Sequence, residues 1–142
     1  MAKKNLLDGP ETFHLEIPAV DTSLIEVRDF IADVCVRAGF SKRETNNTKL
    51  AMDEACTNII KHAYGGDSSG TIALRVEIGS GEVRIEVRDT GKQADVSNIG
   101  PRDLADVRPG GLGTHFMNSV FDTVNYDSSG REGTLLTLIK RL

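Results

Sequence analysis

Apolar and polar residues alternate along three stretches of the chain, and this period of two predicts strands with one buried face; the stretches are 12–18, 72–78 and 83–88. Gly79-Ser80-Gly81 separates the second stretch from the third, so these two strands should form an antiparallel hairpin. Two shorter apolar segments, 124–127 and 134–140, lie on either side of a Ser-Gly turn and predict the last two strands.

A helical spacing of apolar residues marks three other segments. The first predicted helix covers residues 24–38 and is closed by Gly39. The second begins at a capping box, Ser41 to Glu44, and should run to about Tyr64. The third is expected to start near Gly111, with apolar residues on one face.

The resulting order is strand, helix, helix, strand, strand, helix, strand, strand. Helices that pack on one face of a mostly antiparallel sheet give an α+β fold, a two-layer α/β sandwich. With 142 residues and 39% hydrophobic content, the chain is expected to form a single domain, residues 1–142.

The composition of the chain argues against several classes of function. The net charge is −4 and the chain has no basic run of five or more residues, so we expect no nucleic acid and no anionic membrane as partner. No apolar stretch approaches the length of a membrane span, and the start lacks a signal-peptide core, so the expected location is cytoplasmic. Cys35 and Cys56 fit no metal-binding or redox spacing and are expected to be buried thiols.

Polar side chains follow one face of the second predicted helix. Glu54 and Asn58 are four residues apart on the arc opposite the apolar one, which carries Met52, Ala55, Cys56, Ile59 and Ala63. A carboxylate beside an amide oxygen suits a general base and a Mg²⁺ ligand. A solvated helix face fits the same pattern, and Asp53 is interpreted as a solvated flank residue.

An aspartate and a glycine mark the end of the hairpin. Asp89 and Gly91 follow the apolar run of its second strand, where an ionised carboxylate can accept a hydrogen bond from the exocyclic amine of adenine. Taken alone, the motif is more often an ordinary Asp-x-Gly turn. Thr134 opens the last strand, and its hydroxyl either assists nucleotide binding or belongs to an ordinary strand residue.

Twelve of the 14 glycines lie between Gly65 and Gly133, and one cluster leads into the third predicted helix. The free N–H groups of a helix start, approached through glycines, can cradle a phosphate. This cluster, 109–114, is neither a Walker A loop nor a Rossmann fingerprint, and a hinge is an alternative interpretation. The preceding segment, 92–109, has little pattern, which in a small domain is typical of a functional or disordered loop.

The order of these motifs resembles the GHKL superfamily of ATP-binding proteins, which includes gyrase and the histidine kinases. Residues 53–64, Asp-Glu-Ala-Cys-Thr-Asn-Ile-Ile-Lys-His-Ala-Tyr, are similar to the N-box of the bacterial anti-sigma-factor serine kinases of the RsbW type. Residues 110–113, Gly-Gly-Leu-Gly, followed by Phe121-Asp122, resemble the second glycine box of that family. The likeness extends from the first predicted strand to the last.

The resemblance implies a Bergerat ATP-binding fold and transfer of a phosphoryl group from ATP to a serine of a partner protein. In this sequence Glu54 would be the general base, Asn58 the Mg²⁺ ligand and Asp89 the adenine-binding residue, with Gly91 and Thr134 beside it. Residues of about 92–110 would form the ATP lid. The phosphates would meet Arg108 and the backbone N–H groups of Gly110, Gly111, Leu112 and Gly113.

The same resemblance implies the partners. They would be a STAS-domain anti-anti-sigma protein as substrate, a sigma factor as the other usual partner, and a second copy of the chain in a homodimer. Many superfamily members have a second glycine where this chain has Gln93, which puts the lid geometry in question. An ATP-binding module that sequesters a partner without kinase activity is the alternative function. A histidine kinase is disfavoured because His14, in a predicted strand, is the sole upstream histidine.

Overall fold

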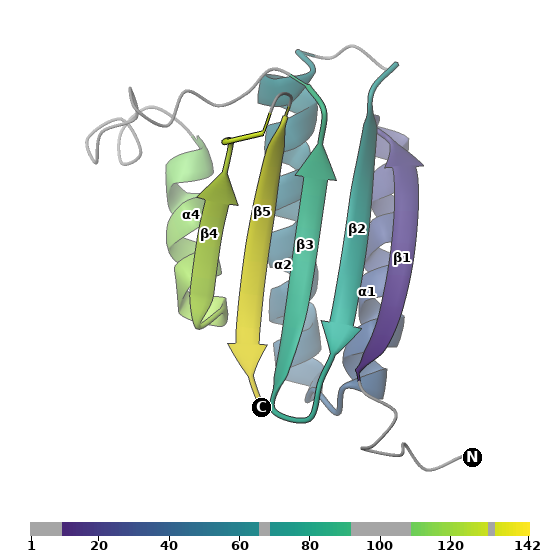
Figure 1. Ribbon diagram of the computed structural model, residues 1–142, viewed down its shortest axis with the longest axis vertical. Helices are drawn as coiled ribbons and strands as arrows, with labels where there is room; N and C mark the ends of the chain where they lie inside the picture. Colours follow the sequence, from purple (N-terminus) through teal and green to yellow (C-terminus); the bar gives the residue numbers. More distant parts are fainter. Residues whose placement is uncertain (1–9, 66–68, 92–108, 131–132) are drawn as a thin grey trace.

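The computed structural model describes residues 10–65, 69–91, 109–130 and 133–142, and for residues 109–114 it describes the backbone alone. Within these residues the chain forms one antiparallel sheet whose single face carries the helices (Figure 1). This is the predicted two-layer α+β architecture.

The sheet contains five strands in the order β1-β2-β3-β5-β4, and every described pairing is antiparallel. The strands are β1 (Glu11–Pro18), β2 (Thr71–Ile78), β3 (Glu82–Asp89), β4 (Thr123–Asp127) and β5 (Thr134–Arg141). The predicted hairpin joins β2 to β3, with Ile78 opposite Val83. Because β5 pairs with β3, the start of the last strand lies beside the end of the hairpin.

Three helices cover the sheet, and Figure 1 shows them all on its far side. They are α1 (Leu24–Arg37), α2 (Lys42–Asn58) and α4 (Pro109–Val120), with a short 3₁₀ turn, η2 (Asp21–Ser23), before α1. The core fills the space between the layers, because alternate strand residues and one stripe of each helix face inward. Its fully buried members include Ile17, Ile31, Met52, Ile72, Leu74, Ile85, Met117 and Leu138.

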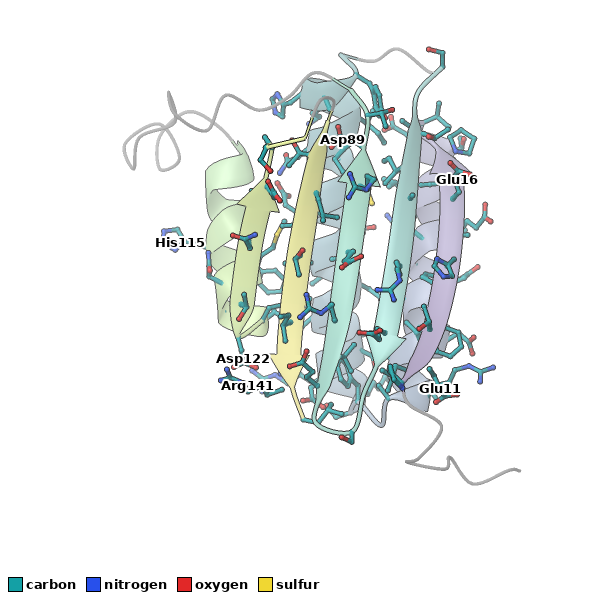
Figure 2. All side chains as sticks on the ribbon, viewed as in Figure 1. Glu11, Glu16, Asp89, His115, Asp122 and Arg141 are labelled. Carbon is teal, nitrogen blue, oxygen red and sulfur yellow. The ribbon has the colours of Figure 1, made fainter. Side chains whose placement is uncertain are left out.

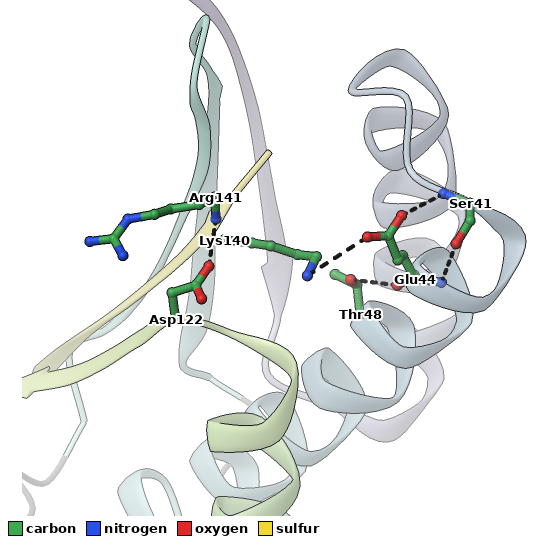
Figure 3. Close-up of polar contacts among 6 residues, drawn as sticks. All are labelled: Ser41, Glu44, Thr48, Asp122, Lys140 and Arg141. Carbon is green, nitrogen blue, oxygen red and sulfur yellow. Dashed lines mark hydrogen bonds and ion pairs between the residues drawn. The ribbon is translucent and has the colours of Figure 1, made fainter.

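The start of α2 is fixed by the predicted capping box (Figure 3). The Glu44 N–H donates to Ser41 Oγ at 3.0 Å, and the Ser41 N–H donates to Glu44 Oε1 at 2.8 Å. Glu44 also lies 3.7 Å from Lys140 Nζ, which links this helix end to β5. The cap therefore sets both where α2 begins and where it meets the sheet.

Hydrogen bonds hold the turn from α4 into β4 at the end of the sheet where α2 begins. Asp122 accepts a hydrogen bond from the Arg141 N–H at 2.7 Å, and its own N–H donates to the Ile139 carbonyl at 2.8 Å (Figures 2 and 3). These bonds join the beginning of β4 to the end of β5, so α4 is tied to the sheet edge.

The end of the second helix differs from the prediction of one continuous helix to about Tyr64. The α-helix stops at Asn58 and continues as a π-helical turn, η3 (Ile59–Ala63), closed by the Tyr64 N–H donating to the Ile59 carbonyl at 3.1 Å. A π turn places more residues in each turn than an α-helix does. The predicted core residues Ile59 and Ala63 are consequently only partly buried, and Ile60 is buried instead.

The third predicted helix begins two residues before the expected start near Gly111. In the structure α4 starts at Pro109. Proline suits the first position of a helix because its φ is already helical and its missing N–H would have had no partner there. The glycine cluster therefore lies within the first turns of the helix.

We expect Ser41→Ala to lower the free energy of unfolding by about 1 kcal/mol, since the Glu44 N–H loses its side-chain acceptor. Urea denaturation measures this change. The exposed hairpin residue Ser80 provides the control. Ser80→Ala removes the same hydroxyl group at a position that does not cap a helix. Equal stability of the two variants would contradict the role of the capping box.

Candidate functional site

Asp89, the last residue of β3, is a buried carboxylate with an exposed fraction of 4%. Its Oδ1 accepts a hydrogen bond from the Gly91 N–H at 3.0 Å, and the backbone of Thr134 on the paired strand also bonds to this carboxylate. Burial raises the pKa of Asp89 above its ordinary value, and the two backbone hydrogen bonds partly oppose that shift. Figure 2 shows this residue at the end of the sheet where β5 begins.

Glycines allow the backbone to approach Asp89 closely. Gly133 has φ +70°, and a Cβ at this position would collide with the Asp89 carbonyl oxygen. A Cβ at Gly91 would lie 2.5 Å from the Ala63 carbonyl oxygen. A side chain at either position would push the segments around the carboxylate apart, so both glycines are required by packing.

Thr134 reaches the site through its backbone, because its hydroxyl is occupied elsewhere. Thr134 Oγ1 lies 2.9 Å from Ser128 Oγ in the turn between β4 and β5. The residue thus bonds to the predicted adenine-binding carboxylate and to the turn that precedes its own strand.

Glu54 and Asn58 occupy successive turns near the end of α2, and both are half-buried. Neither side chain has a hydrogen-bond partner among the residues that the structure describes. Within the described part of the chain, their carboxylate and amide oxygens thus keep their capacity to accept hydrogen bonds. The i,i+4 spacing places them on one side of the helix, as the sequence predicted.

Tyr64 connects this helix to the segment that follows Asp89, and sequence reasoning missed it. The phenol donates to the Thr71 carbonyl at 2.6 Å and accepts from the Thr90 N–H at 2.8 Å. The last residues of the N-box segment are thereby joined to the start of β2 and the end of β3. The available signal in the sequence is an aromatic residue between a helix and the Gly65-Gly66 loop, a position that by itself predicts only the end of the helix.

Asp53 is an ion-pair residue, which corrects its interpretation as a solvated flank. Arg28 Nε donates to both of its carboxylate oxygens, at 3.0 and 2.9 Å. The pair joins α1 to α2 next to Glu54. The sequence held no signal for it, because the two residues lie 25 positions apart.

The glycine cluster supplies backbone N–H groups at the start of α4. Gly110, Gly111, Leu112 and Gly113 lie in its first turns. Since the first N–H groups of a helix lack intrahelical partners and Pro109 has no N–H, the free groups lie at the start of this cluster, at Gly110 and Gly111, whereas the Gly113 N–H lies far enough along the helix to bond within it. Arg108 and the predicted lid up to residue 108 lie outside the described residues.

The described part of the chain contains no cluster of the side chains that most often hold a metal ion. No group of three or more His, Cys, Asp or Glu residues there could hold one. Asn58 with phosphate oxygens is compatible with this, because Mg²⁺ commonly takes few protein ligands and completes its shell with phosphates and water. Nor is any described helix both long and apolar enough to cross a membrane.

Comparison with known proteins identifies the family. The model of the histidine kinase-like ATPase domain matches residues 17–140. The serine-protein kinase RsbW of Halalkalibacterium halodurans is 30% identical over 141 residues, which cover 94% of this chain and 85% of that protein. The protein of the same name from Bacillus subtilis is 28% identical, with 95% and 88% covered. The chain belongs to the RsbW-type histidine kinase-like ATPases.

Solved structures support the fold. The RsbU and RsbW domains of Rv1364c from Mycobacterium tuberculosis match with a TM-score of 0.66 at 20% identity, over 93% of this chain and 32% of that one. The histidine kinase domain of Erythrobacter litoralis EL346 matches with a TM-score of 0.58 at 20% identity, over 89% and 62%. This chain spans about a third of the first structure and less than two thirds of the second.

Membership in this family implies that the chain binds ATP. The predicted resemblance and fold class are thereby confirmed. The roles predicted for individual residues stay predictions, and the geometry above is what supports them.

We expect Asp89→Asn to gain stability relative to the natural protein as pH rises from about 4 to about 7. The raised pKa of Asp89 means that the folded state keeps a proton that the unfolded state has already released. This carboxyl therefore makes the natural protein less stable as pH rises, and the amide does not. Urea unfolding across that pH range measures the difference.

Asp127→Asn is the matched control, because its shift has the opposite sign. The Ser129 hydroxyl and N–H donate to Asp127 and lower its pKa. Stability from this carboxyl is present above the pKa of the unfolded state and is lost as pH falls. Because that loss lies below about pH 4, Asp127→Asn should show no change in stability relative to the natural protein between about pH 4 and about 7. A relative gain over that range as large as that of Asp89→Asn would contradict the assignment.

Proposed function

We propose that this protein is an ATP-dependent protein serine kinase and anti-sigma-factor regulator. Its substrate would be a serine of a STAS-domain anti-anti-sigma protein in a partner-switching pathway. The observation that carries the proposal is a buried, hydrogen-bonded carboxylate, Asp89, joined through Tyr64 to the helix that carries Glu54 and Asn58. Neither of these two side chains has a hydrogen-bond partner among the described residues. The similarity to serine-protein kinases named RsbW supports the reaction class.

Asp89 is proposed to accept a hydrogen bond from the adenine amine. Its two backbone donors, Gly91 and Thr134, hold the carboxylate in one orientation and leave it further acceptor capacity for the adenine amine. Since the group is buried, a hydrogen bond to it is stronger than one in water. Gly91 keeps this wall of the site free of a side chain.

The other end of the nucleotide is proposed to lie between α2 and the start of α4. Asn58 would hold Mg²⁺ together with the phosphates, and the ion would supply charge neutralisation there. Of the predicted cradle Gly110, Gly111, Leu112 and Gly113, the N–H groups at the helix start, those of Gly110 and Gly111, suit phosphate oxygens. Arg108 is proposed to contact the γ-phosphate, and residues of about 92–110 to form the lid of a single domain, 1–142.

Glu54 is proposed as the general base. Phosphoryl transfer passes through a loose transition state, so the protein mainly positions the reactants and stabilises charge. As the serine oxygen bonds to the γ-phosphorus, the bond to the β,γ-bridging oxygen breaks and ADP leaves. The serine proton passes to the Glu54 carboxylate.

The proposed partners follow the family likeness. They are the STAS-domain substrate, a sigma factor that this protein would sequester, and a second copy of the chain in a homodimer. An ATP-binding module that controls a partner by sequestration alone is the alternative, and phosphoserine in the STAS protein separates the two functions.

We expect Glu54→Gln to lower the rate of serine phosphorylation by about 10²- to 10⁴-fold, the usual contribution of a general base, while ATP binding is retained. Mass spectrometry of the STAS partner after incubation with Mg-ATP measures the product, and displacement of a labelled nucleotide measures binding.

Glu82→Gln is the control for this experiment, because Glu82 starts β3 at the end of the strand opposite Asp89. It should phosphorylate the partner at the natural rate. Natural activity in Glu54→Gln would exclude Glu54 as the base. Absence of phosphoserine with the natural protein, despite ATP binding, would favour the sequestering module.

We expect Asn58→Ala to weaken ATP binding in the presence of Mg²⁺ by roughly tenfold and to leave binding in EDTA nearly unchanged. The reason is that the variant removes a metal ligand and leaves the adenine end intact. Nucleotide titrations with and without Mg²⁺ measure the two affinities. Equal weakening under both conditions would contradict a metal-binding role for Asn58.

A further inference from the structure

We propose that Tyr64 is a positioning residue that holds the Asp89 carboxylate in the orientation needed to select adenine over other purines. This inference rests on the proposed function, because it assumes that Asp89 meets the base of ATP. It adds a residue to the site and a reason for nucleotide specificity.

The Tyr64 hydroxyl lies between two strand ends. It donates to the Thr71 carbonyl at 2.6 Å and accepts from the Thr90 N–H at 2.8 Å, and its oxygen lies 3.3 Å from Thr90 Oγ1. Thr71 begins β2 and Thr90 follows β3. One phenol thus bonds to the backbone of both neighbouring strands, at the end of the sheet where Asp89 lies.

Two glycines enclose the tyrosine ring. A Cβ at Gly70 would collide with the ring, and a Cβ at Gly91 would lie 2.8 Å from its Cδ1 atom. Gly91 is also packed on the Ala63 carbonyl. Because backbone approaches the ring closely from both of these positions, the ring is confined and its hydroxyl has one location.

A short chain of contacts leads from the hydroxyl to the carboxylate. Tyr64 fixes the Thr90 N–H, Gly91 is the next residue, and the Gly91 N–H donates to Asp89 Oδ1 at 3.0 Å. Movement of Thr90 would carry the Gly91 amide with it and release the carboxylate oxygen that it orients. Tyr64 therefore acts through Gly91 on Asp89.

The same residue sets the distance between the two ends of the proposed site. Tyr64 follows the π turn that begins directly after Asn58. The helix that carries Glu54 and Asn58 is therefore connected through this phenol to the strand end that carries Asp89. Loss of the hydroxyl should disturb recognition of the base before it disturbs the helix, whose backbone bonds remain.

ATP and ITP separate positioning from general structural support. Hypoxanthine has a carbonyl where adenine has its amine, so ITP cannot donate a hydrogen bond to Asp89 from that position. A site built to receive a donor discriminates against a ligand that lacks it, because its buried acceptor is then left unpaired. The ratio of the two affinities therefore reports the orientation of the carboxylate.

The test is Tyr64→Phe, which keeps the ring against both glycines and removes the hydroxyl. We expect the ATP dissociation constant to rise roughly tenfold and that of ITP to change by less than about twofold. Displacement of a labelled nucleotide from the full chain measures both constants. Tyr126→Phe is the matched control, because it removes the only other phenol, on β4, and should leave the ratio unchanged.

A double-mutant cycle with Asp89→Ala tests the route of the effect. If Tyr64 acts through Asp89, Tyr64→Phe has no further effect on ATP affinity in the Asp89→Ala background. Asp89→Ala measured alone provides a second test if Tyr64→Phe does not fold: it should lower the ATP preference, and an unchanged ATP-to-ITP ratio in that variant would overturn the inference.

The outcomes distinguish this inference from the proposed function. Failure of the natural protein to bind ATP would overturn the proposed function. Natural ATP binding with an unchanged ATP-to-ITP ratio in Tyr64→Phe would overturn the inference alone. Equal weakening of both nucleotides would also overturn it, since that result means structural support without base selection.

Discussion

The candidate site depends on one constraint: at two glycines around the end of β3, the backbone lies closer to its neighbours than a Cβ atom would allow. The Gly91 backbone lies against the Ala63 carbonyl, and Gly133 lies against the Asp89 backbone. Neither approach tolerates a Cβ atom. Because the two contacts meet around one carboxylate, the sheet and the helix layer form a site here as well as a core.

The burial of Asp89 lowers the stability of the fold at the position that is proposed to bind the ligand. Burial raises the pKa of Asp89, so the ionised form is held in the fold at a cost that the Gly91 and Thr134 hydrogen bonds only partly offset. The core of alternating apolar strand residues supplies the stability that permits it. Departures from good local stability are expected to gather at functional sites, and here the unfavourable group is a proposed ligand-binding residue.

Much of the fold could be predicted, because its signals are local. The capping box at Ser41, the alternating hairpin and the helical stripes each involve residues within a few positions of one another. The candidate residues Glu54 and Asn58 could be predicted from the sequence for the same reason, since a helix brings positions four apart together. The π turn could not be predicted, because the spacing of apolar residues does not distinguish one turn with i→i+5 hydrogen bonds from a continuing α-helix.

The sequence by itself determined the order of elements, the helix face of Glu54 and Asn58, and the place of Asp89 at a strand end. The tertiary structure decided which of these ends meet. The Tyr64 contact with Thr90 spans 26 residues and the Arg28 pair with Asp53 spans 25. Such contacts depend on how the layers pack, and no local pattern encodes them, because the partners become neighbours only after the sheet and helices have assembled.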